Sequence, residues 1–185
     1  YLDIDYLDTI ADVRVNGELV LSAKNCFRRY RPDVSKVLKP GRNRIEILFH
    51  SNPKAANALQ ASMPFPVPYA AQNCPIPNGN MLRKPACHFG WDWNIAIAPL
   101  GLYGRIELRR FDRIRIENVR VHQTHNDDGS VDVMVDIELK GRPSGLVPYE
   151  IRFGDQTKMS VEENDAELQS HLSHFHIEKP DLWWP

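Results

Sequence analysis

The sequence predicts an all-β protein built as two consecutive β-sandwiches. Short runs of alternating apolar and polar residues recur along most of the 185 residues, and turn signals separate them. The alternation changes character at Asp112, where longer and tighter runs begin. A chain of this length can bury one large core or two smaller ones. We therefore expect one sandwich over residues 1–111 and a second over residues 112–185.

The first strands are predicted around a hairpin signal. Residues 13–21 alternate on both sides of Asn16-Gly17, the favoured pair for a type I′ turn. Residues 1–5 and 9–15 also have the pattern of strands. This order of a strand followed by a hairpin is typical of a two-sheet sandwich.

The rest of the first half combines strands with a long loop. Residues 27–39 predict a strand and a short turn of helix, and Pro40-Gly41 ends them. Residues 44–50 predict a strand, the alanine-rich residues 53–61 a short helix, and residues 103–111 a closing strand. Residues 63–85 hold six prolines and no period, so we expect a rigid, partly extended loop that shapes a pocket rim. A mobile insertion is the alternative.

The second half of the sequence predicts strands at regular spacing. The alternating runs cover residues 113–117, 119–121, 131–139, 147–153 and 167–177, and Asp127-Asp128-Gly129 supplies a turn. Short strands with turn signals at this spacing predict an immunoglobulin-like sandwich. The acidic cluster Glu162-Glu163-Asn164-Asp165 is expected to form a solvated turn.

An aromatic motif stands in the middle of the chain and reads Cys-His-Phe-Gly-Trp-Asp-Trp over residues 87–93. Gly90 permits a sharp turn. The indole rings of Trp91 and Trp93 suit the C–H face of a pyranose, and an ionised Asp92 can accept hydrogen bonds from neighbouring sugar hydroxyls. The same residues also fit a structural role, in which the tryptophans fill a sandwich core and Asp92 caps a turn.

Composition argues against several classes of partner. The formal net charge is −1 and the basic residues are scattered, so no nucleic-acid partner is expected. No apolar run reaches the length needed to cross a bilayer, so no membrane partner is expected. Cys26, Cys74 and Cys87 lack metal-ligand spacing and are expected to be reduced thiols, which favours the cytoplasm; one disulfide is the alternative in an exported protein.

Other candidate sites lack the residues that their chemistry needs. His174 and His176 would share one face of a strand near His171, but no carboxylate or cysteine stands at a convincing spacing, so we expect no metal. Neighbouring residues on a strand point to opposite faces, which argues against a Cys87–His88 dyad. No phosphate loop or dinucleotide motif is present in the sequence, and no cofactor is expected.

Several motifs resemble glycoside hydrolase family 2, in particular its β-mannosidases. Residues 83–93 resemble the family's RKxxxxFGWDW segment, and residues 101–108 resemble its closing strand. The family's sugar-binding jelly roll is resembled by three motifs in chain order: D-x-x-A-x-V-x-V-N-G, F-x-x-Y-x-x-D-V-S and L-K-P-G-x-N-x-I-x-I. The last residues, Asp-Leu-Trp-Trp-Pro, resemble the LWWP run that ends the family's immunoglobulin-like domain.

This resemblance implies a galactose-binding-like jelly roll followed by an immunoglobulin-like sandwich, and a non-catalytic N-terminal piece of a retaining exo-β-mannosidase. Trp91, Asp92 and Trp93 would reach into the sugar pocket of a separate catalytic barrel, the chain's partner, which carries both catalytic glutamates. The substrate would be a terminal β-D-mannoside. We expect no catalytic residue in this chain, no activity of the piece alone, and strands missing before Tyr1.

Two alternatives remain open from the sequence. A carbohydrate-binding module with no attached chemistry would share the jelly-roll architecture. A β-galactosidase or β-glucuronidase would share the family and differ in its sugar. The chain that follows would distinguish the first alternative, and the choice between aryl β-mannoside and aryl β-galactoside would distinguish the second.

Overall fold

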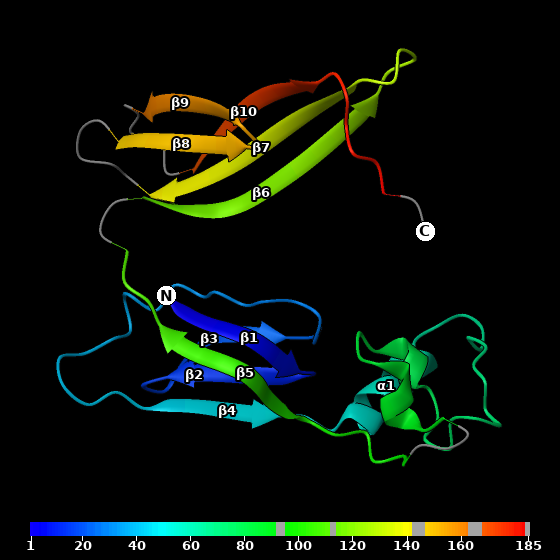
Figure 1. Ribbon diagram of the computed structural model, residues 1–185. Helices are drawn as coiled ribbons and strands as arrows, with labels where there is room; N and C mark the ends of the chain where they lie inside the picture. Colours follow the sequence, from blue (N-terminus) through cyan, green and yellow to red (C-terminus); the bar gives the residue numbers. More distant parts are fainter. Residues whose placement is uncertain (92–94, 112–113, 142–146, 163–167, 184–185) are drawn as a thin grey trace. The chain divides into compact units, whose positions relative to one another are not determined.

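The chain forms two compact units, Tyr1–Arg110 and Phe111–Pro185. The computed structural model describes residues 1–91, 95–111, 114–141, 147–162 and 168–183. Strands dominate both units (Figure 1). Over these described ranges, no helix combines the length and apolar character needed to cross a bilayer.

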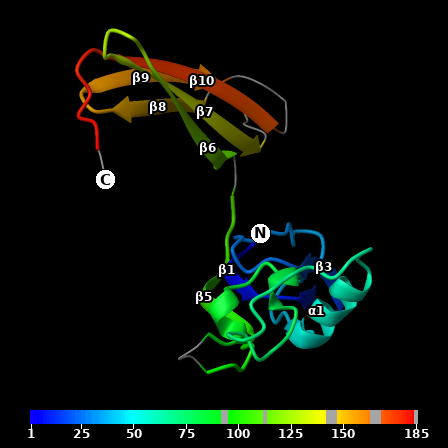
Figure 2. The same cartoon turned by 90° about the vertical axis from the view of Figure 1, so that its right-hand side faces the viewer.

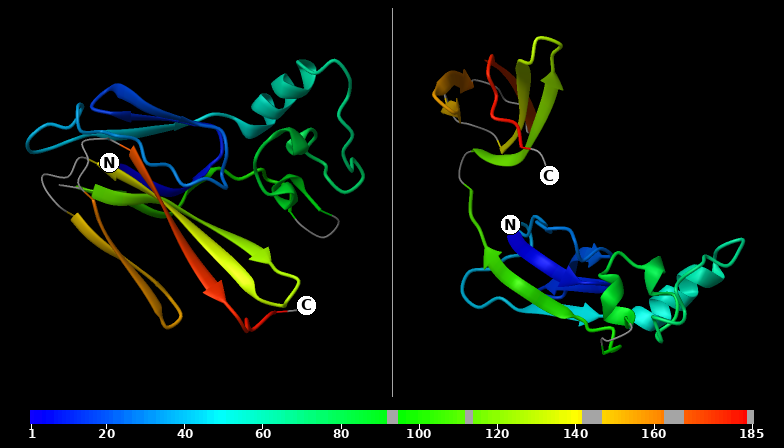
Figure 3. Two further views of the ribbon diagram at one scale, coloured as in Figure 1. Left: turned by 90° about the horizontal axis from the view of Figure 1, so that it is seen from above. Right: turned by 45° about the vertical axis from the view of Figure 1, so that its right-hand side comes forward.

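The first unit contains two antiparallel sheets (Figure 1). One is the pair β1 and β5, and the other has the order β3-β2-β4. The right-hand view of Figure 3 shows β1 and β5 side by side. The strands span Leu2–Asp8 (β1), Ala11–Val15 (β2), Glu18–Ala23 (β3), Ile45–Phe49 (β4) and Gly101–Leu108 (β5).

The predicted hairpin is confirmed. Strands β2 and β3 pair in antiparallel register, and both turn residues have positive φ, 53° at Asn16 and 92° at Gly17, as a type I′ turn requires. The Asn16 side chain also donates to the carbonyl of Val37 at 2.7 Å and to Asn43 at 2.8 Å. One local pair therefore sets the hairpin and also holds the loop before β4.

The core of the first unit lies where alternate residues of β1 and β2 point inward. Leu2, Ile4 and Leu7 come from β1, and Ala11, Val13 and Val15 come from β2; Ala23 and Val34 complete the buried cluster. Leu102 of β5 and Ile47 of β4 pack against it. Full burial of each leucine, isoleucine or valine of this cluster contributes about 1.5–3 kcal/mol to folding.

The prediction of a strand within residues 27–39 is wrong. Only a single bridge forms there, between Tyr30 and Ile4. Pro32 has no N–H to continue a ladder, and the Asp33 carboxylate accepts from the backbone N–H of Ser35 at 2.8 Å, which turns the chain. The expected turn follows, because the N–H groups of Val37 and Leu38 both donate to the carbonyl of Val34.

Helix α1, Asn52–Ala61, confirms the predicted helix; Ser51 caps it and Pro53 lies in its first turn. The segment after it contains two short 3₁₀ helices, η1 (Gly79–Met81) and η2 (Ala86–Phe89). Figures 1 and 2 show α1 and these turns gathered beyond one end of the strands of this unit. Phe89, Leu82, Ala56 and Ala98 form a second buried cluster there.

The second unit contains a three-stranded sheet of order β10-β7-β6 and a hairpin of β8 and β9. The left-hand view of Figure 3 shows the hairpin, in orange, as a separate ribbon, and Ile151 of β8 packs into the same core as β7 and Phe175 of β10. Val131, Val133, Val135, Ile137 and Leu139 all point from β7 into the core, as the alternation predicts. The strands span Ile114–His125 (β6), Val131–Gly141 (β7), Val147–Phe153 (β8), Gln156–Glu162 (β9) and Leu168–Ile177 (β10).

Candidate functional site

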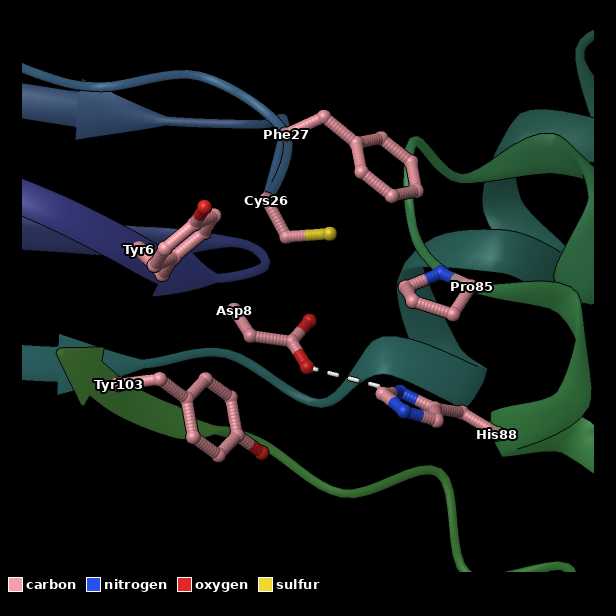
Figure 4. A pocket seen from close by; sticks show the side chains of 7 residues that line it. All are labelled: Tyr6, Asp8, Cys26, Phe27, Pro85, His88 and Tyr103. Atoms are coloured by element: carbon pink, nitrogen blue, oxygen red, sulfur yellow. Dashed lines mark ion pairs between the residues drawn. The ribbon is translucent and has the colours of Figure 1, made fainter.

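A cavity of about 370 Å³ opens at the end of β1 in the first unit (Figure 4). Three aromatic side chains and three polar ones surround it, together with one proline. We call it the Asp8 cavity, and its lining residues are Tyr6, Asp8, Cys26, Phe27, Pro85, His88 and Tyr103.

An irregularity in β1 directs Tyr6 toward this cavity. The register between β1 and β5 shifts between Ile4 and Tyr6. Leu2 and Ile4 are buried in the core, and strict alternation would place the Tyr6 side chain in the core as well. Leu7 is buried instead, whereas Tyr6 is 54% exposed. The shift therefore aligns Tyr6 with Tyr103, its partner on β5, at the cavity.

A buried ion pair lies beside the cavity. The ammonium of Lys84 contacts the carboxylate of Asp8, and the two side chains are 0% and 2% exposed. Lys84 also donates to the carbonyl of Pro99 at 2.7 Å, and the hydroxyl of Thr9 donates to Asp8. A lone buried charge is costly, and each of these two side chains has the other as its partner of opposite charge.

Three titratable groups of the Asp8 cavity have pKa values shifted toward their uncharged forms. Burial lowers the pKa of His88, the Lys84 ammonium lowers it further, and Asp8 opposes both effects. Burial and then Asp8 raise the pKa values of the Cys26 thiol and the Tyr103 phenol. With Asp8 and Lys84 balancing each other, the aromatic walls enclose a space that suits an uncharged ligand.

His88 lies 3.7 Å from Asp8, measured from Nδ1 to Oδ2 (Figure 4). It belongs to η2, not to a strand, so the strand premise of the argument against a Cys87–His88 dyad is wrong. A 3₁₀ helix has three residues per turn, which places residues i and i+3 on one side. Pro85 and His88 accordingly face the Asp8 cavity, whereas Cys87 is exposed on another side.

The remaining side of η2 faces a second, smaller cavity of about 160 Å³. We call it the Trp91 cavity, and it is lined by Tyr69, Ala70, Cys74, Gly79, Asn80, Ala86, Phe89 and Trp91. Several of these residues come from the proline-rich segment, which therefore forms a pocket wall, as expected. Cys74 donates from its thiol to the carbonyl of Gly90 at 3.3 Å, and the N–H of Ile76 donates to Phe89.

The aromatic motif is described up to Trp91. Gly90 has φ 103°, which confirms the predicted turn, and a Cβ there would lie 2.3 Å from Pro75. Trp91 is 37% exposed, so it is not a buried core residue. Asp92 and Trp93 lie outside the described residues. Their proposed roles rest on the sequence.

Sequence reasoning missed most of the Asp8 cavity. Asp8 and Lys84 are 76 residues apart, and Tyr6, Cys26 and Tyr103 carry no local signal of a shared site. In the sequence, Lys84 is distinguished only as one residue of the motif at residues 83–93. The pairing of β1 with β5 and the course of the proline-rich segment bring these residues together.

The histidines of β10 lie beside an aspartate of β7. His174 and His176 share one face of β10, as predicted, and both contact Oδ1 of Asp132, at 3.0 and 2.7 Å. Among the side chains that the structure describes, no group of three His, Cys, Asp or Glu residues is placed to hold a metal ion. Cys26, Cys74 and Cys87 are free thiols.

Comparison with known protein families assigns both units. The family described as glycosyl hydrolase 2 galactose-binding domain-like matches residues 1–104. The description glycosyl hydrolases family 2 matches residues 114–185. The chain belongs to glycosyl hydrolase family 2. This assignment confirms the predicted all-β fold class of a galactose-binding-like sandwich followed by an immunoglobulin-like one.

Individual relatives agree with the family assignment. The chain is 27% identical to β-mannosidase B of Aspergillus niger over 193 residues and 28% identical to β-mannosidase A of Emericella nidulans over 207 residues. Both alignments cover 100% of this chain and 22% of the relative. The chain thus spans about a fifth of the length of these family 2 proteins.

Solved structures show the same fold. The β-D-mannosidase of Dictyoglomus thermophilum superposes with a TM-score of 0.77 at 19% identity, covering 100% of this chain and 23% of that one. The exo-chitosanase of Amycolatopsis orientalis gives a TM-score of 0.62 at 15% identity, covering 100% and 20%.

Proposed function

We propose that this family 2 chain is the N-terminal part of a retaining β-mannosidase that releases terminal β-D-mannose. Its part in the reaction is to build one side of the sugar pocket. The observation that carries the proposal is the alignment of the whole chain, across both units, with proteins named β-mannosidases. The mannosidase-like motif at residues 83–93 supports the same sugar.

The geometry around the motif fits this role. Gly90 turns the chain sharply after η2, and Trp91 follows it, half-exposed against the wall formed by the proline-rich segment. In the proposed enzyme, Asp92 accepts hydrogen bonds from two sugar hydroxyls. Trp91 and Trp93 form the wall of the pocket or support Asp92.

The chemistry of bond cleavage is assigned to a part of the enzyme beyond these residues. Retaining hydrolysis needs two carboxyl groups about 5–5.5 Å apart, one as acid/base and one as nucleophile. Of the described residues that line the Asp8 cavity, Asp8 alone carries a carboxylate, and Lys84 already neutralises it. We therefore expect the 185 residues alone to hydrolyse no aryl glycoside.

The proposal is tested by Asp92→Ala in the full-length protein. Removing a carboxylate that binds two hydroxyls in a desolvated site costs about 1.5–3 kcal/mol. We therefore expect kcat/KM on an aryl β-mannoside to fall about 10- to 150-fold, with little change in melting temperature. Steady-state kinetics and thermal unfolding of the same preparation give both quantities.

Asp127→Ala provides the matched control, because Asp127 is an exposed carboxylate in the second unit. It should leave kcat/KM unchanged. If Asp92→Ala instead lowers the melting temperature strongly and leaves kcat/KM of the folded enzyme intact, Asp92 caps a turn and the sugar-binding role is wrong.

A further inference from the structure

The two ends of the segment that carries the aromatic motif meet at a single buried side chain. We call residues 85–99 the tryptophan loop. Lys84 immediately precedes the loop, and its Nζ donates to the carbonyl of Pro99, the last residue of the loop, at 2.7 Å. The same Nζ contacts the carboxylate of Asp8 at the end of β1. Lys84 therefore joins both ends of the loop to the sandwich.

Two further hydrogen bonds lie near the place where the two ends of the tryptophan loop meet. The N–H of Ala98 donates to the carbonyl of His88 at 2.9 Å, which pairs the two sides of the loop. The amide of Asn52, a fully buried residue at the start of α1, donates to the carbonyl of Pro99 at 3.2 Å. The carbonyl of Pro99 thus accepts from two donors on different elements.

Charge neutralisation alone does not require this arrangement. A buried ion pair usually contributes no more stability than apolar side chains of the same volume, because both charges lose their hydration. Asp8 and Lys84 form such a pair, and the Lys84 ammonium also donates a hydrogen bond to the carbonyl of Pro99. The contact with Asp8 ties the start of the loop to β1, and the bond to Pro99 joins the end of the loop to the same ammonium.

We propose that Lys84 is the positioning residue of the tryptophan loop: it joins the described ends of the loop at Pro99 and so holds the turn that carries Trp91. The consequence for catalysis rests on the proposed function, but the anchoring itself does not. Lys84 touches no sugar in this account, and it acts through the residues that the loop carries.

The competing interpretation is that Lys84 only neutralises Asp8. Lys84→Met leaves a buried carboxylate unpaired, so this single variant is expected to lose stability under either interpretation. The double variant Asp8→Asn/Lys84→Met removes both charges and should recover most of the melting temperature. It cannot recover the bond to Pro99. Only the positioning role predicts that the hydrogen bond between Ala98 and His88 opens more often in the double variant.

The test is amide hydrogen exchange at Ala98 in the full-length protein. In Asp8→Asn/Lys84→Met, we expect Ala98 to exchange about ten- to a hundredfold faster than in the wild type, the loss typical of a hydrogen bond to a charged donor. Lys54→Met removes an exposed lysine from α1 of the same unit and should leave that rate unchanged. Wild-type exchange at Ala98 in a well-folded double variant would overturn the proposal.

Kinetics separate this proposal from the proposed function. If both are right, the double variant loses kcat/KM on an aryl β-mannoside to a similar extent as Asp92→Ala, while its melting temperature stays near that of the wild type. If Ala98 exchanges faster but neither variant changes kcat/KM, the anchoring stands and the sugar-binding role of the loop is wrong. If Asp92→Ala alone reduces kcat/KM, Lys84 does not position the loop.

Discussion

Two aspartates illustrate how differently this chain stabilises a carboxylate. Asp8 is buried and depends on the ammonium of Lys84 and the hydroxyl of Thr9. Asp132 lies on the surface of the second unit, where it accepts from Asn126 at 2.8 Å and contacts His174 and His176. The bond from Asn126 first, and then the one from His176, lower the pKa of Asp132 to about 2.

The Asp132 cluster predicts a defined pH dependence of stability. The pKa of Asp132 is lowered, so its ionised form adds to the free energy of unfolding above about pH 4. This addition is lost as the pH falls toward 2. The hydrogen bond to Asp132 raises the pKa of His176. The protonated His176 therefore adds fully to the free energy of unfolding below about pH 6.5, and this addition is lost as the pH rises through the raised pKa. The cluster therefore stabilises the fold most between these limits.

Asp132→Asn should accordingly lower the melting temperature more at about pH 5 than at about pH 9. Some loss should remain at the higher pH, because it is Asn126, not a histidine, that makes the largest contribution. Asp127→Asn, in the nearby exposed turn, is the control for a change of one surface charge. Equal losses at both pH values would show that the histidines do not contribute.

Among the elements, the short helix η2 organises the candidate site. Its three sides face the Asp8 cavity, the Trp91 cavity and solvent. Phe89 is its most buried residue and packs closely on Gly79 of η1, where an added Cβ would lie 2.3 Å from the ring. Gly79 has no positive φ, so this contact is the reason that only glycine fits.

Gly79→Ala should therefore destabilise the first unit by about 1–3 kcal/mol, the usual cost of overpacking. Urea denaturation of the full-length protein, followed by a probe in the first unit, measures the loss. The double variant Gly79→Ala/Phe89→Leu should recover part of it, because the smaller side chain makes room for the methyl group. A single variant as stable as the wild type would contradict the close packing of η1 on η2.

Elements with strong local signals could be predicted from the sequence. The β2–β3 hairpin was predicted from Asn16-Gly17 between alternating residues, and α1 from an alanine-rich run with Pro53 at its start. Residues 27–39 misled the prediction, because Pro32 and the Asp33 turn outweigh the apolar pattern. Strand β9 was missed because its sequence, QTKMSVE, is mostly polar; it forms by pairing with β8.

At the scale of the whole molecule, the family could be recognised from linear motifs, but the site could not be assembled from them. The motif at residues 83–93 is continuous in sequence and is visible without a structure. The Asp8–Lys84 pair spans 76 residues and depends on the fold. A buried aspartate and a buried lysine carry no sequence pattern that predicts their contact.

The family assignment covers both units, whereas the sugar is a proposal that concerns the intact protein. The most direct test compares full-length protein on aryl β-mannoside and aryl β-galactoside under identical conditions. We predict a kcat/KM at least about a hundredfold higher on the mannoside, because a pocket built to hydrogen-bond particular hydroxyls rejects sugars that place them differently. An equal or higher kcat/KM on the galactoside would contradict the assignment to the β-mannosidases.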